Sequence, residues 1–193
     1  MITPNGTVSL KKSSSDSLIK NQIGLREALF LLGLGLASVL IHVSTRRMMQ
    51  IPGHQGIGWI GLLMLARRNS DFRWASLVSS IGAATVSAAP MWSFHDPFRF
   101  ITMPLAAVTI DLLFCGTENF RNNAYFLSAA GGLAHMTKPV FRVGLASVRG
   151  WPYGSLRWGL AYPSATHFLF GLLGSLAAIA ISAIVNPRKI AGQ

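Results

Sequence analysis

Five histidines are the side chains in this sequence best suited to chemistry, and each lies at or near the border of an apolar segment. They are His42, His54, His95, His135 and His167. A neutral imidazole offers one hydrogen-bond donor and one acceptor, which suits it to the edge of a heterocyclic ligand. No two histidines stand four residues apart and the chain has a single cysteine, so a helical zinc-ligand pair and a multi-cysteine metal site are excluded. We therefore expect neither a metal nor a cofactor.

Polar and aromatic residues close to the histidines extend this set. Gln55 follows His54 directly after the Pro52-Gly53 turn. Lys138 precedes Pro139, where we expect a helix break whose freed backbone groups line a cavity. The sequence predicts a binding site for a small molecule formed by His54, Gln55, Trp59, His95, His135, Lys138 and His167. The alternatives are a plain surface turn around Gly53 and an aromatic belt at a membrane interface.

Enzyme motifs are absent or out of context. Residues 56–61, GIGWIG, match the dinucleotide-binding pattern, but no strand precedes them and no acid follows at about 20 residues. The sequence lacks the phosphate-binding loop of ATPases and the nucleophile elbow of serine hydrolases. We therefore expect a protein that is not an enzyme and has no ATPase of its own. Asp111 is the one acid inside an apolar run, and we favour structural pairing with Arg26 or Arg121 over a functional role.

The composition indicates that these groups lie in a membrane. Only 12% of the residues are charged, against about 25% in a typical soluble domain. The net charge is +11, but the basic residues stand between apolar runs rather than along one face, which argues against a nucleic-acid partner. The chain therefore reads as an integral membrane protein in contact with the lipid bilayer.

The apolar runs predict an all-α bundle of about six transmembrane helices in one domain, residues 25–187. The expected helices cover 28–43, 56–66, 74–91, 100–115, 124–136 and 163–185. The second and fifth are short for a span of roughly 20 residues. The alternatives are an extension of the fifth past Pro139 through VFRVGLASV (140–148) and a total of four or five spans. Residues 1–24 and 188–193 are expected to be cytosolic tails, and residues 137–162 to form a loop, a lid or a re-entrant helix.

Lysine and arginine are more numerous on the side that would hold both termini, which favours an arrangement with both ends inside. In that arrangement all five histidines and most tryptophans and tyrosines fall near the outer face. Aromatic belts usually occupy both interfaces, so a one-sided group favours a binding cavity.

Small residues stand at helical spacing in the first apolar run, where Gly33 and Ala37 are four residues apart. Such pairs let helix backbones approach closely, either within one protein or between partners. Together with IPGHQGIGW (51–59), GGLAHMTKP (131–139) and YPSATHF (162–168), this plan resembles the substrate-binding S component of an energy-coupling factor (ECF) vitamin transporter. Gly33 stands where that family commonly has alanine, and Ile2 stands where its metal-specific members have histidine.

The resemblance implies a capture subunit in the plasma membrane of a bacterium. It would bind a vitamin or vitamin precursor near the outer face, under the first outer loop, through the seven residues named above. A membrane coupling protein would dock on Gly33 and Ala37, and cytosolic ATPases would supply the energy. Two other classes remain open: a small integral-membrane enzyme acting on a lipid or quinone through His95-Asp96 or Asp111, and a structural subunit that only docks helices.

Overall fold

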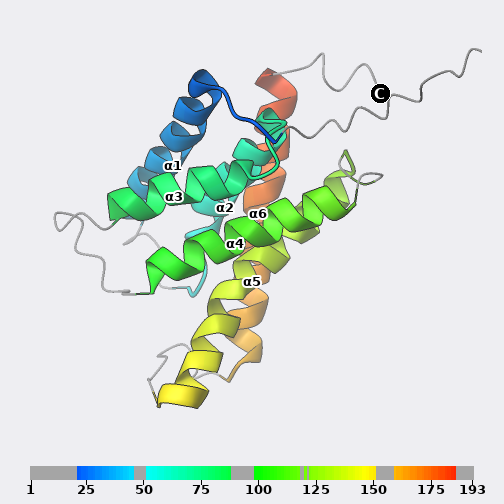
Figure 1. Ribbon diagram of the computed structural model, residues 1–193. Coiled ribbons are helices and arrows are strands. Elements are labelled where there is room, and N and C mark those ends of the chain that lie inside the picture. The colour runs from blue at the N-terminus through cyan, green and yellow to red at the C-terminus, as the bar shows by residue number, and fades with distance from the viewer. Residues whose placement is uncertain are drawn as a thin grey trace, which may run out of the picture.

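The computed structural model describes residues 21–45, 51–87, 98–117, 120, 122–150 and 159–185, and these ranges are helical with no strand. The helices are α1 (Leu25–Thr45), α2 (Gly56–Asn69), α3 (Ala75–Ser87), α4 (Arg99–Gly116), α5 (Ala124–Arg149) and α6 (Ala161–Val185). Each coincides with one of the predicted apolar segments, so the all-α class is confirmed for the described part of the chain (Figure 1).

Three of these helices, α1, α4 and α6, are long and apolar enough to cross a membrane. α2 and α3 have 14 and 13 residues. At 1.5 Å per residue they extend about 20 Å, against a hydrocarbon core of about 30 Å. The described residues therefore support a helical membrane protein with three candidate spans. Six spans, the orientation of the termini and the cytosolic tails stay predictions.

Helix α5 differs from its prediction. We expected a break at Pro139, but the helix continues through this proline to Arg149. Proline leaves the carbonyl four residues earlier without its usual donor, yet apolar helices tolerate this where neighbouring groups compensate. Close by, the Thr137 hydroxyl donates to the Ala134 carbonyl at 2.7 Å. The predicted break is therefore wrong, and residues 137–149 are helix rather than loop.

The end of α5 and its beginning are both capped. The Asn123 side chain accepts a hydrogen bond from the Phe126 N–H at 3.0 Å, which is a typical N-cap. At the other end Gly150 has φ +66°, and its N–H donates to the Ala146 carbonyl at 2.9 Å. This left-handed glycine ends the helix.

Glycines form the closest approaches between helices. A Cβ at Gly35 of α1 would overlap the Ser79 carbonyl of α3, and one at Gly61 of α2 would lie 2.9 Å from the Gly174 carbonyl of α6. The backbones are thus in near contact, as small residues permit in membrane helix packing. The buried core between these crossings is apolar and includes Val39, Trp59, Ile60, Leu63, Met64, Met103, Ala106, Ala107, Ile110, Leu127 and Ala178.

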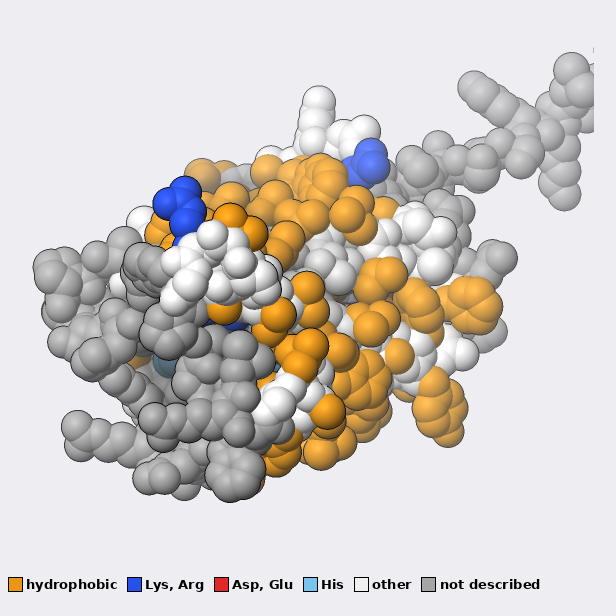
Figure 2. All heavy atoms as spheres, turned by 90° about the horizontal axis from the view of Figure 1, so that it is seen from below, with side chains coloured by type: hydrophobic (Ala, Val, Ile, Leu, Met, Phe, Trp, Pro, Cys, Tyr) orange, Lys and Arg blue, Asp and Glu red, His pale blue; other side chains and the backbone are white. Residues whose placement is uncertain are grey.

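The outward sides of the helices are also apolar. Leu29 of α1 is 60% exposed and Ile184 of α6 is 80% exposed. Figure 2 shows one face of the molecule, on which hydrophobic side chains cover much of the described surface. A helix that is apolar on its outward side as well as toward the core is typical of a lipid environment.

Candidate functional site

The loop between α1 and α2 lies directly on two imidazoles. The Nε2–H of His135 donates to the Gly53 carbonyl at 2.9 Å. A Cβ at Gly53 would lie 2.9 Å from atoms of His167, and one at Gly56 would overlap the His135 ring. Gly53 also has φ +82°, which favours glycine. Glycine at these two positions therefore allows the loop backbone to contact the rings.

Beneath the loop, Trp59 of α2, His135 of α5 and His167 of α6 form what we call the histidine cluster. The ring centroids of His135 and His167 are 4.6 Å apart, and those of Trp59 and His135 are 5.2 Å apart in an edge-on arrangement. All three side chains are buried. Three helices thus bring together residues that are far apart in the sequence.

The two imidazoles of the cluster have defined donors. His135 must carry a hydrogen on Nε2 because it faces a carbonyl, and His167 Nδ1 likewise donates to the Pro163 carbonyl at 2.7 Å. Nδ1 of His135 is buried and has no hydrogen-bond partner among the described residues. A buried acceptor left in this way costs about 1–3 kcal/mol, so a ligand that donates a hydrogen bond there would recover that cost.

His54 and Gln55 lie in the loop itself. The His54 ring places Nδ1 2.8 Å from the Ile51 carbonyl and Nε2 3.3 Å from the Thr45 carbonyl, so it ties the loop to the end of α1. Gln55 is the N-cap residue of α2, and its side chain makes no capping hydrogen bond. Both side chains are half-buried.

The remaining predicted residues are more scattered. Lys138 lies on α5, one turn after His135, and is half-buried. His95 lies outside the described residues. On α1, Gly33 is exposed with open space where a Cβ would stand, and Ala37 is half-buried. The structure thus brings Trp59, His135 and His167 into contact, and places the others around them or elsewhere.

Two basic residues at the contact of α4 with α5, Arg99 and Arg142, are absent from the predicted site. Arg99 is the first residue of α4, is only 8% exposed, and donates from Nε to the Met103 sulfur at 3.4 Å. The Arg142 guanidinium lies 4.9 Å from the centre of the Phe98 ring. The spacing of Lys138 and Arg142, four residues apart, would have shown this pair if α5 had been expected to continue past Pro139.

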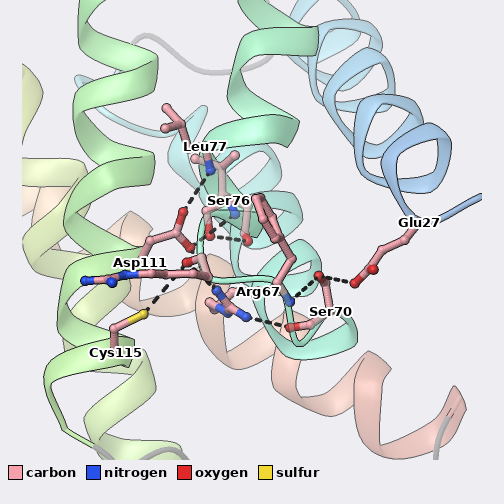
Figure 3. Close-up of polar contacts among 10 residues, drawn as sticks. Glu27, Arg67, Ser70, Ser76, Leu77, Asp111 and Cys115 are labelled. Atoms are coloured by element: carbon pink, nitrogen blue, oxygen red, sulfur yellow. Dashed lines mark hydrogen bonds and ion pairs between the residues drawn. The ribbon is translucent and has the colours of Figure 1, made fainter. Parts of the chain in front are cut away.

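A second polar cluster, the Arg67 network, lies at the other end of α2 (Figure 3). Arg67 donates to the Ser70 carbonyl at 2.6 Å and to the Arg73 carbonyl at 2.9 Å, and its Nη1 lies 3.4 Å from Oδ1 of Asp111. The two carboxylate oxygens accept from the backbone N–H groups of Ser76 and Leu77 at 3.2 and 3.0 Å. Asp111 therefore closes the amino-terminal end of α3.

We expected Asp111 to have a structural role, and the Arg67 network shows one, with a different cation from the two that we named. The carboxylate forms a buried ion pair with Arg67 rather than with Arg26, and Arg121, the other expected partner, lies outside the described residues. The Arg67 guanidinium also stacks 4.6 Å from the centre of the Phe114 ring. Helix α1 joins the network where Ser70 Oγ donates to Glu27 Oε1 at 2.5 Å.

Among the described residues no three of His, Cys, Asp or Glu are grouped so that they could hold a metal ion. The site is thus a set of two imidazoles and one indole beneath a short loop. No family model matches this chain, and no curated protein or solved structure matches it.

Proposed function

We propose that this protein is the substrate-capture subunit of an ATP-driven vitamin or vitamin-precursor importer of the ECF kind. In this role it binds a small ligand within the membrane and works with a coupling protein and cytosolic ATPases in the plasma membrane of a bacterium. The observation that carries the proposal is the loop of residues 51–56 lying on the buried histidine cluster.

The loop is suited to opening and closing over a ligand. It is joined to α5 by one described side-chain hydrogen bond, from His135 to Gly53, and to α1 through the His54 ring. Each neutral hydrogen bond contributes only about 0.5–1.5 kcal/mol when water replaces the lost partner, so opening the loop to water costs little compared with unfolding a helix. Opening would uncover His135, His167 and Trp59 together.

The proposal assigns the ligand contacts to His54, Gln55, Trp59, His95, His135, Lys138 and His167. It assigns the contact with the coupling protein to Gly33 and Ala37. The outward position of Gly33 supports this second assignment, because Gly35, two residues later, faces α3 and serves internal packing. One side of α1 is therefore used inside the bundle, and the side with Gly33 is left to lipid or a partner helix.

The test is to purify the full chain in mild detergent and identify bound small molecules by mass spectrometry. A panel of vitamins is then screened for an increase in thermal stability. His54→Ala and Lys138→Ala should each weaken binding of the identified ligand by about tenfold or more, the value of one lost hydrogen bond. Tyr125→Ala, at a side chain that is 87% exposed on the first turn of α5, is the control and should bind normally.

Two results would contradict the proposal. One is a preparation that carries only phospholipid and is stabilised by no vitamin, which favours the membrane-enzyme or structural-subunit alternatives. The other is unchanged affinity in both variants, which removes the assigned site.

A further inference from the structure

Each imidazole of the histidine cluster gives one hydrogen to a main-chain carbonyl. The Nε2–H of His135 donates to the Gly53 carbonyl at 2.9 Å, and the Nδ1–H of His167 donates to the Pro163 carbonyl at 2.7 Å. A carbonyl oxygen can only accept, so these two bonds define which nitrogen of each ring carries the hydrogen. The second nitrogen of each ring, Nδ1 of His135 and Nε2 of His167, is then available as an acceptor.

Neither of these acceptors has a hydrogen-bond partner among the described residues. Nδ1 of His135 is buried and unpartnered, and the one hydrogen bond described for the His167 ring is made by its other nitrogen. The two side chains are only 1% and 3% exposed. A second hydrogen on either ring would create a buried cation with an unpaired donor, which is costly, so both rings are neutral. The cluster therefore presents two nitrogen lone pairs.

The packing around His135 fixes the direction of its ring. A Cβ at Gly56 would overlap the imidazole, and a Cβ at Gly171 would lie 2.7 Å from the Cβ of His135, so the backbones of α2 and α6 confine this side chain. The Trp59 ring meets it edge-on, with 5.2 Å between the centroids. Turning the ring would also break its hydrogen bond to the Gly53 carbonyl. The unpartnered Nδ1 is thus a fixed feature of the site.

The two lone pairs decide which chemical groups the cluster can recognise. The ring centroids of His135 and His167 are 4.6 Å apart, so one small planar ligand can contact both rings. A carboxylate or phosphate would bring further lone pairs to these acceptors, whereas an N–H group would donate to them. Because both rings are uncharged, an uncharged donor can be buried against them without a counter-ion.

We infer that the ligand of the histidine cluster is an uncharged, planar nitrogen compound whose N–H groups donate to Nδ1 of His135 and Nε2 of His167. The inference rests on the proposed capture function and names the chemistry of its ligand. The loop of residues 51–56 lies on the same two rings, so it has to lift before such a ligand enters. The indole of Trp59 then provides apolar surface beside His135.

The test compares two probes that differ only in their donors. Benzimidazolone is planar and neutral and has two N–H groups, whereas its 1,3-dimethyl form has none. Each is titrated against the full chain in phosphatidylcholine nanodiscs, with EDTA present so that no metal ion takes part, and thermal stability is measured. Benzimidazolone should stabilise the protein saturably. The dimethyl form and benzoate should bind about tenfold more weakly or not at all, since they leave the acceptors unpaired.

Two conservative variants remove the acceptors and keep the donors. His135→Gln places an amide N–H where the Nε2–H stands, and His167→Asn places one where the Nδ1–H stands, so the bonds to the carbonyls can persist. Each variant should bind benzimidazolone about tenfold more weakly and, without ligand, should unfold close to the wild-type temperature. Tyr125→Ala, at a side chain that is 87% exposed on the first turn of α5, is the control and should bind normally.

Equal stabilisation by benzimidazolone and its dimethyl form, tighter binding of benzoate, or unchanged binding in both histidine variants would overturn the inference. The probe comparison on the wild type decides this even where a variant fails to fold. A vitamin that binds equally to wild type, His135→Gln and His167→Asn also overturns it, while the capture function stands. Conversely, a chain that binds benzimidazolone as expected but retains only phospholipid and responds to no vitamin supports the acceptor pair and contradicts the capture function.

Discussion

Replacing Asp111 by alanine should destabilise the protein strongly. Its carboxylate pairs with Arg67 and accepts hydrogen bonds from the N–H groups of Ser76 and Leu77. Both charged side chains are almost fully buried, with exposures of 1% and 0%. The substitution therefore leaves a guanidinium in the core without its carboxylate and opens the amino-terminal end of α3.

The expected decrease in the free energy of unfolding follows from two losses, the ion pair and the helix cap. Breaking a buried ion pair from one side costs about 3–5 kcal/mol, and losing a helix cap costs about 1 kcal/mol. Because one carboxylate serves both functions, we expect a combined loss of about 4 kcal/mol for Asp111→Ala. Asp111→Asn keeps one acceptor oxygen for α3 and should cost less. Arg67→Gln should resemble Asp111→Ala, since it also removes donors to the Ser70 and Arg73 carbonyls.

The assay is equilibrium unfolding in mixed micelles of dodecyl maltoside with increasing dodecyl sulfate, followed by circular dichroism. A double-mutant cycle of Arg67→Gln and Asp111→Asn should give a coupling energy of about 1–3 kcal/mol. Asp71→Asn, at an exposed acid in the neighbouring turn, is the control. The reasoning is refuted if Asp111→Ala loses no more stability than the control, or if the two single losses simply add.

Two glycine comparisons test the packing of the site and of α1. Gly53→Ala should abolish ligand binding, because the new Cβ would press on His167. The control is Gly150→Ala, which is also at positive φ but has no atom within 4 Å of the new Cβ, and it should bind normally. Normal binding in both variants would show that the loop does not lie on His167 as described. Gly35→Ala should lower the free energy of unfolding by about 1–3 kcal/mol, the usual cost of overpacking, whereas Gly33→Leu should leave the isolated chain stable and reduce its recovery with the coupling protein. Equal stability losses at Gly33 and Gly35 would contradict the different sides assigned to them.

The sequence predicts where each helix lies, but it does not predict where every helix ends. Apolar runs located all six described helices, because burying or embedding that much apolar surface leaves little alternative to a helix. Pro139 misled the prediction for α5 because its missing N–H is costly in water-exposed helices. In an apolar environment a complete break would strand more backbone groups than a single missing hydrogen bond, so the helix continues.

The contacts between helices are less accessible to sequence reasoning. Arg67 and Asp111 are 44 residues apart, and their pairing depends on the rotation and depth of α2 relative to α4. Those are set by backbone contacts such as Gly61 on Gly174, which no local pattern locates. The sequence placed Trp59, His135 and His167 at a common end of their segments, and the structure brings their rings into contact. The contact of Arg142 with Phe98 depends on the full length of α5.

Both polar clusters also supply hydrogen-bond partners to backbone groups at the two ends of the short helix α2. α2 extends about 20 Å beside the longer α6, so its ends and the adjoining turns lie beside apolar neighbours, where an unpaired backbone group costs several kcal/mol. His135 donates to a loop carbonyl at one end of α2, and Arg67 donates to two turn carbonyls at the other. The polar residues that the sequence marks as functional thus also complete the backbone hydrogen bonding of the fold. For this reason, weaker binding in a His135 variant identifies a ligand contact only if the free energy of unfolding is unchanged.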